Sequence, residues 1–133
     1  MKTIGYMSGT FDLFHIGHLN IIKKAKKNCD YLVVGVHESG AWKGKVTFIP
    51  FEERLEIISS IRYVDEVVKS YPNDTDAIDF HNIKKLFVGD DYKGSDRFKL
   101  YETICFKANV EIIYFKYTNS TSSTKLRDVL QKI

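Results

Sequence analysis

The chain has 133 residues, 44% of them hydrophobic, which fits a single domain over residues 1–133 with one core and leaves little room for a second. Its net charge is +3 and its lysines are spread over several segments, which argues against a nucleic-acid surface and fits a small anionic ligand. Because no run approaches the roughly 18 apolar residues of a membrane span, and Cys29 and Cys105 lie far apart without metal-ligand spacing, we expect a cytoplasmic protein with reduced thiols, no membrane insertion and no structural metal.

Short apolar runs rich in β-branched residues alternate with segments of helical spacing along the whole chain. The predicted strands are residues 3–7, 31–36, 64–68, 86–89 and 110–115. The predicted helices follow the first loop, Pro50 and Ser95, with a short helix over 76–81 and a last one that carries Leu126, Val129 and Leu130. This alternation predicts a single-domain α/β fold, a doubly wound, Rossmann-like parallel sheet of five strands with helices on both faces.

The loop after the first predicted strand reads GTFDLFHIGH, residues 9–18. Gly9 allows the backbone to turn close to a ligand, and Gly17 allows close approach where a helix begins. That helix start offers unpaired N–H groups to an anion, and His15 and His18 would project beside it as further donors to a phosphate. Two histidines at this spacing also suit a metal, but no third ligand stands at a supporting distance. The loop therefore predicts a phosphate site.

GTFDLFHIGH resembles the signature of the HxGH nucleotidyltransferases, and the chain resembles their cytidylyltransferase branch, in particular the bacterial glycerol-3-phosphate cytidylyltransferases. The other matching motifs are DYLVVGV (30–36), WKGK (42–45), RYVDEVV (62–68), VGDDYKG (88–94) and TSSTKLR (121–127). The resemblance implies transfer of CMP from CTP to a small phosphorylated alcohol, with glycerol 3-phosphate as the leading acceptor and pyrophosphate as the second product. It also implies Mg²⁺ held mainly by the triphosphate, and a homodimer.

The resemblance assigns roles to residues of the first three loops. His15 and His18 would donate to the charge that develops on the phosphates, while Thr10 and Phe11 would line the nucleotide pocket with Gly9 and Gly17. Asp12 more simply fixes the turn. Lys43 and Lys45 match the family's basic loop and would bind the acceptor phosphate, although without the resemblance a solvated loop is the simpler interpretation. Arg62 would contact a phosphate, with Lys45 and Arg62 also catalytic, and Arg54 is a weaker candidate.

Two later motifs complete the predicted nucleotide site. Gly89, Asp90, Asp91 and Tyr92 would contact the cytosine and ribose, although an aspartate-rich turn explains one of the two carboxylates equally well. The hydroxyls of Thr118, Ser122, Ser123 and Thr124 would bind the triphosphate, unless one serine only caps the final helix. The chain departs from the family's RTxGIST pattern here, because Tyr117 replaces the arginine and Ser120 the glycine.

Several alternatives stay open at this point. Phosphocholine, phosphoethanolamine or a capsule precursor would serve as acceptors in the same reaction. A nucleotide-binding regulatory module that has lost turnover is the alternative from another class, favoured by Tyr117 and Ser120 and opposed by the intact His15 and His18.

Overall fold

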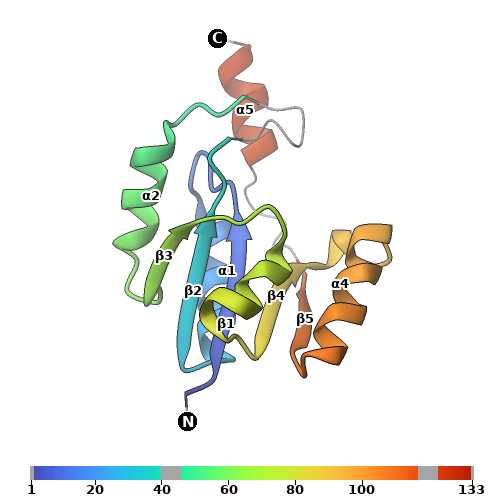
Figure 1. Cartoon of the computed structure of the whole chain (residues 1–133). Helices are drawn as coiled ribbons and strands as arrows, with labels where there is room; N and C mark the ends of the chain where they lie inside the picture. The colour runs from blue at the N-terminus through green and yellow to red at the C-terminus, as the bar shows by residue number, and fades with distance from the viewer. Residues whose placement is uncertain (1, 40–45, 117–122, 133) are drawn as a thin grey trace.

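A computed structural model of the chain describes residues 2–39, 46–116 and 123–132. It contains one parallel sheet of five strands in the order β3-β2-β1-β4-β5. The strands are β1 (Ile4–Gly9), β2 (Tyr31–Val36), β3 (Glu66–Lys69), β4 (Lys85–Gly89) and β5 (Glu111–Phe115). The doubly wound α/β fold is confirmed, and the chain proceeds outward from β1 first on one side and then on the other (Figure 1).

Helices cover both faces of the sheet because β2 is apolar on both. Leu32 and Val34 pack in one cluster with residues of α1 (Ile16–Lys27) and α2 (Phe51–Ser59). Val33 packs on the opposite face with residues of α3 (Ala77–His81) and α4 (Asp96–Lys107). The last helix, α5 (Ser123–Gln131), lies beyond the carboxyl ends of the strands (Figure 1). Within the described ranges, no helix has the length and apolar character needed to cross a membrane.

Several element boundaries differ from the prediction by one or two residues. The first strand continues to Gly9, which pairs with Val36. The third strand starts at Glu66 instead of residue 64, because the Val64 N–H is used in a turn, where it donates to the Ile61 carbonyl at 3.0 Å. The predicted short helix over 76–81 is confirmed as α3, which starts at Ala77 because a 3₁₀ turn, η2 (Asp74–Asp76), precedes it.

Candidate active site

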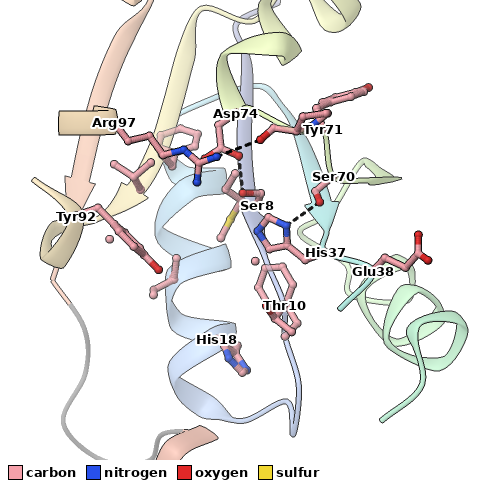
Figure 2. Close-up of a pocket in the computed structure, with 18 of the residues that line it drawn as sticks. Ser8, Thr10, His18, His37, Glu38, Ser70, Tyr71, Asp74, Tyr92 and Arg97 are labelled. Atoms are coloured by element: carbon pink, nitrogen blue, oxygen red, sulfur yellow. Dashed lines mark hydrogen bonds between the residues drawn. The ribbon is translucent and has the colours of Figure 1, made fainter. Parts of the chain in front are cut away.

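A cavity of about 900 Å³ opens at the carboxyl ends of the strands, beside β1, where the strand order reverses. Ser8 and Gly9 of β1 line it together with His37 after β2, Ser70 after β3 and Gly89 at the end of β4 (Figure 2). Open parallel sheets bind their ligands in this position, because the strands diverge there and the loops leave a crevice. The cavity is therefore the candidate active site.

His15 and His18 cap the start of α1, because the ring of each accepts a backbone N–H group there. The Gly17 N–H donates to Nδ1 of His15 at 3.0 Å, and the His15 N–H donates to Nδ1 of His18 at 3.3 Å. The two rings stack with their centroids 3.9 Å apart. His18 lines the cavity, and His15 lies directly behind it. The structure thus brings both predicted histidines to the edge of the candidate site.

These contacts determine where each imidazole carries its proton. A nitrogen that accepts a hydrogen bond from a backbone N–H cannot itself be protonated, so the neutral ring has its proton on Nε2. Burial also lowers the pKa of His15, which favours the neutral form. Both rings are therefore placed to donate from Nε2, a hydrogen bond that a phosphate oxygen can accept.

The loop between β1 and α1 is held in an unusual backbone conformation. Phe11 has φ +54° and Leu13 has φ +52°, in the left-handed region that residues with a side chain rarely adopt. A Cβ on Gly9 would lie only 2.9 Å from the Phe11 ring, so the glycine is needed for close packing rather than for a turn. Strained loops of this kind persist where the surrounding contacts over-determine them, as at ligand sites.

Asp12 supplies much of that restraint. Its buried carboxylate accepts the backbone N–H of Phe48 at 2.8 Å and of Ile49 at 2.9 Å, and it pairs with Arg127 of α5. The side chain therefore joins the first loop to the segment before α2 and to α5, a wider role than the predicted one of fixing its own turn.

Arg54, the weaker sequence candidate for a phosphate contact, has a structural role. It is 1% exposed, and among the described residues its guanidinium donates to backbone carbonyls. The acceptors are Ile49 and Thr10 at 2.8 Å, His37 at 2.6 Å and Glu38 at 2.7 Å. The side chain thus ties α2 to the loops after β1 and β2, below the cavity surface.

The structure does not bring Arg62 to the cavity. The residue is exposed, precedes β3 and donates to its neighbour's hydroxyl, on Tyr63, at 2.8 Å. Asp65, three residues further along the chain, is hydrogen-bonded to Leu32 at the start of β2. Arg62 therefore lies near the amino ends of the parallel strands, whereas the cavity is at their carboxyl ends. Arg62 is therefore not among the residues that line the cavity of this single chain, and its phosphate contact stays a prediction.

The motif after β4 is only partly at the cavity. Gly89 and Tyr92 line it, and the Tyr92 ring stacks on Phe98 of α4 at 5.3 Å. Asp90 is half-buried in the turn η3 (Asp90–Tyr92) and is not a lining residue. The side chain of Asp91 lies outside the described part of the structure, as do Lys43, Lys45, Thr118 and Ser122. Ser123 and Thr124 are described by their backbone alone, at the start of α5.

Two polar atoms in the wall of the cavity lack a hydrogen-bond partner among the described residues. They are Oγ1 of Thr10 and Nε of Arg127, both buried. A buried polar group without a partner costs free energy, and at a binding site a ligand commonly supplies the partner. Sequence reasoning identified Thr10 but not Arg127, although the arginine belongs to the TSSTKLR motif.

Another group of polar side chains, absent from the sequence predictions, lies where β1, the turn η2 and α4 meet at the cavity. The Ser8 hydroxyl donates to the Asp74 carboxylate at 2.6 Å, and Arg97 of α4 points toward the same carboxylate (Figure 2). Burial raises the pKa of Asp74, while the Ser8 hydrogen bond and the charge of Arg97 act in the opposite direction. Asp74 follows β3 in a segment without a motif, so the sequence offered no signal for it.

Comparison with known proteins assigns a family to this architecture. A family model described as cytidylyltransferase-like matches residues 6–129. The glycerol-3-phosphate cytidylyltransferase of Bacillus subtilis (strain 168) is 37% identical over 131 residues, which cover 96% of this chain and 95% of that protein. The ethanolamine-phosphate cytidylyltransferase of Dictyostelium discoideum is 42% identical over 92 residues, 65% of this chain and 26% of that longer protein.

A solved structure shares the fold. The lipopolysaccharide core biosynthesis protein from Thermoplasma volcanium matches with a TM-score of 0.73 and 22% sequence identity, over 91% of this chain and all of the other. At this identity the likeness concerns the fold alone.

Proposed function

Because the chain belongs to the cytidylyltransferase-like family, we propose that it transfers CMP from CTP to a small phosphorylated alcohol, with glycerol 3-phosphate as the leading acceptor. The observation that carries the proposal is the histidine pair at the start of α1, fixed as Nε2 donors beside a cavity of nucleotide size. The full-length similarity to a glycerol-3-phosphate enzyme supports the acceptor.

The proposed reaction needs positioning and charge stabilisation more than covalent chemistry. An oxygen of the acceptor phosphate attacks the α-phosphorus of CTP and forms a new P–O bond. The bond from that phosphorus to the bridging oxygen breaks, and pyrophosphate leaves with the electron pair. Negative charge grows on the α-phosphate and on the leaving group, where preorganised donors stabilise the transition state more than the ground state.

Residues of this chain supply those donors at the proposed site. His18 at the cavity wall and His15 behind it would donate from Nε2, and the unpartnered Thr10 and Arg127 atoms would bind phosphate oxygens. Gly89 and Tyr92 would contact the nucleoside. We keep Lys43, Lys45, Asp91, Thr118, Ser122, Ser123 and Thr124 as proposed ligands by resemblance.

Mg²⁺ fits this site as a companion of the triphosphate. The acidic side chain of the first loop, Asp12, already binds two backbone N–H groups and Arg127, so we propose that phosphate oxygens provide most of the ion's ligands. The bound ion would neutralise phosphate charge.

Assembly and location complete the proposal. β3 is an edge strand, and residues 69 and 70 at its end line the cavity, so a homodimer formed along residues 62–68 would lie near the active site. Arg62 would then belong to that interface. The two cysteines, Cys29 and Cys105, are free thiols, which suits the reducing cytoplasm.

A screen of pyrophosphate release tests the activity. The four nucleoside triphosphates are each combined with glycerol 3-phosphate, phosphoethanolamine and phosphocholine. We expect release with CTP and glycerol 3-phosphate above every other pair. A preference for ATP would contradict the cytidine assignment, and CTP binding without release from any pair would favour the regulatory module.

A further inference from the structure

We infer that Asp74, Ser8 and Arg97 form the acceptor end of the cavity and select a phosphorylated polyol over a phosphorylated amino alcohol. The inference rests on the proposed function and adds residues that no motif assigns. It concerns the uncharged part of the acceptor, because the histidine pair and the unpartnered donors account for the phosphates.

The three side chains come from three separate elements and meet at one place. Ser8 lies in β1, Asp74 in the turn after β3 and Arg97 in the first turn of α4. All three line the cavity, and Figure 2 shows them at the end opposite His18. An acceptor between these ends would present its phosphate toward the histidines and its alcohol toward Asp74.

The Asp74 carboxylate is fixed but still has acceptor capacity. One oxygen receives the Ser8 hydroxyl at 2.6 Å, and the Asp74 backbone N–H donates to the Tyr101 hydroxyl at 3.3 Å. A carboxyl group keeps acceptor positions beyond this one in either protonation state, so some remain for the hydroxyl groups of a ligand.

The charge balance favours hydroxyl groups over an ammonium group. Arg97 already provides a positive charge beside Asp74, and its guanidinium also lies 5.9 Å from the centre of the Tyr101 ring. An aromatic face and a carboxylate together would otherwise suit an ammonium ion. With the positive charge of Arg97 near both groups, a second cation would be repelled, whereas neutral hydroxyls can still donate to Asp74.

Two substitutions test the inference through acceptor preference. kcat and KM are measured with CTP for glycerol 3-phosphate and for phosphoethanolamine, in the parent, Asp74→Asn and Arg97→Gln. Asp74→Asn should raise the KM for glycerol 3-phosphate about tenfold or more, since a charged hydrogen-bond partner is lost, while the KM for CTP stays within about twofold. Arg97→Gln should shift the ratio of kcat/KM values toward phosphoethanolamine by about tenfold.

Asp79→Asn is the matched control, because this exposed aspartate of α3 lies outside the cavity and should leave both acceptors unchanged. Melting temperatures identify a variant that fails to fold. Arg97 is exposed, so Arg97→Gln keeps the test valid if Asp74→Asn unfolds.

An unaltered acceptor preference in Arg97→Gln, or an unaltered KM for glycerol 3-phosphate in folded Asp74→Asn, would overturn this inference alone. No pyrophosphate release by the parent with any acceptor would overturn the proposed function and this inference with it.

Discussion

His15 and His18 occupy the positions at which a helix more often carries a serine or threonine and a glutamate or glutamine. Imidazole can replace those side chains as a cap because Nδ1 accepts a backbone N–H, and it adds a second nitrogen that the usual residues lack. One pair of residues therefore fixes the start of α1 and presents Nε2 donors at the cavity. The cap explains why the histidines are three residues apart.

Substitutions that keep the cap but remove Nε2 separate the two roles. In His15→Asn and His18→Gln, the side-chain oxygen can still accept the backbone N–H, so the melting temperature should stay close to that of the parent. kcat should fall by about 10² to 10³, the loss seen when one preorganised donor is removed, with little change in CTP affinity. His15→Ala is the control for capping, expected to lower stability by about 1 kcal/mol as well. Near-normal kcat in folded His18→Gln would exclude a catalytic role for that histidine.

The raised pKa of Asp74 predicts that the stabilities of the parent and of Asp74→Asn change differently with pH. Its raised pKa, caused mainly by burial and opposed by Ser8 and Arg97, means that the folded protein binds this proton more tightly than the unfolded chain. The free energy of unfolding therefore falls as pH rises from the ordinary carboxyl range, near about pH 4, through the raised value. Asp74→Asn removes this loss, so its stability relative to the parent should increase as pH rises from about 4 through the raised pKa. Urea unfolding of the parent and of Asp74→Asn at several pH values measures the difference in their free energies of unfolding. A difference that does not change with pH would contradict a raised pKa of Asp74 in the folded protein.

The predicted site residues that line the cavity belong to short motifs at or after the end of a strand. Gly9, Thr10, Phe11, His18 and Tyr92 all line it. The burial of Arg54 was not predictable, because its acceptors lie as far as 44 residues away, at Thr10, and no local pattern shows that an arginine will be buried. Asp74 was missed because its partner Ser8 is 66 residues distant. Local chemistry was visible in the sequence, whereas pairings between distant loops were not.

At the scale of elements, α5 and the segment before α2 are held to the first loop by two arginines. Arg127 pairs with Asp12, donates to the Val46 carbonyl at 2.8 Å and lies 5.4 Å from the centre of the Phe48 ring. Arg54 binds the loops from the other side. The strands and helices followed from hydrophobic periodicity, but these cross-links decide how the loops form a cavity.

Arg54→Ala should therefore be a folding variant and not a binding variant. It leaves four backbone carbonyls without their donor in a buried place, and we expect a loss of about 3 kcal/mol or more in the free energy of unfolding. Chemical denaturation measures this loss, with Arg62→Ala as an exposed control that should change monomer stability by less than about 0.5 kcal/mol. A stable Arg54→Ala protein with weakened phosphate binding would restore the original interpretation of Arg54 as a ligand.

At the scale of the whole molecule, the doubly wound order places β1 in the centre and its following loop at the point where the order reverses. That topology was predictable from alternating strands and helices, because crossover connections between parallel strands have one strongly favoured hand. The lengths and packing of several loops together decide which residues meet across the cavity. The group around Asp74 could therefore be identified only in the structure.

The proposed homodimer is tested on the whole molecule. Sedimentation at micromolar concentration should give a species of twice the 15.4 kDa chain mass, and Arg62→Glu should weaken it if residues 62–68 form the interface. A parent that sediments as a monomer would contradict the proposed homodimer. The matched control is Lys107→Glu, at the end of α4 and far along the sheet from β3.

The product of the reaction tests the central claim most directly. ³¹P nuclear magnetic resonance follows CTP and glycerol 3-phosphate with the parent protein in the presence of Mg²⁺. The account predicts that CDP-glycerol and pyrophosphate form in equal amounts as CTP disappears, without free CMP. Unchanged CTP, or its hydrolysis to CMP or CDP without a CDP-alcohol, would contradict the assignment of this cavity to cytidylyl transfer.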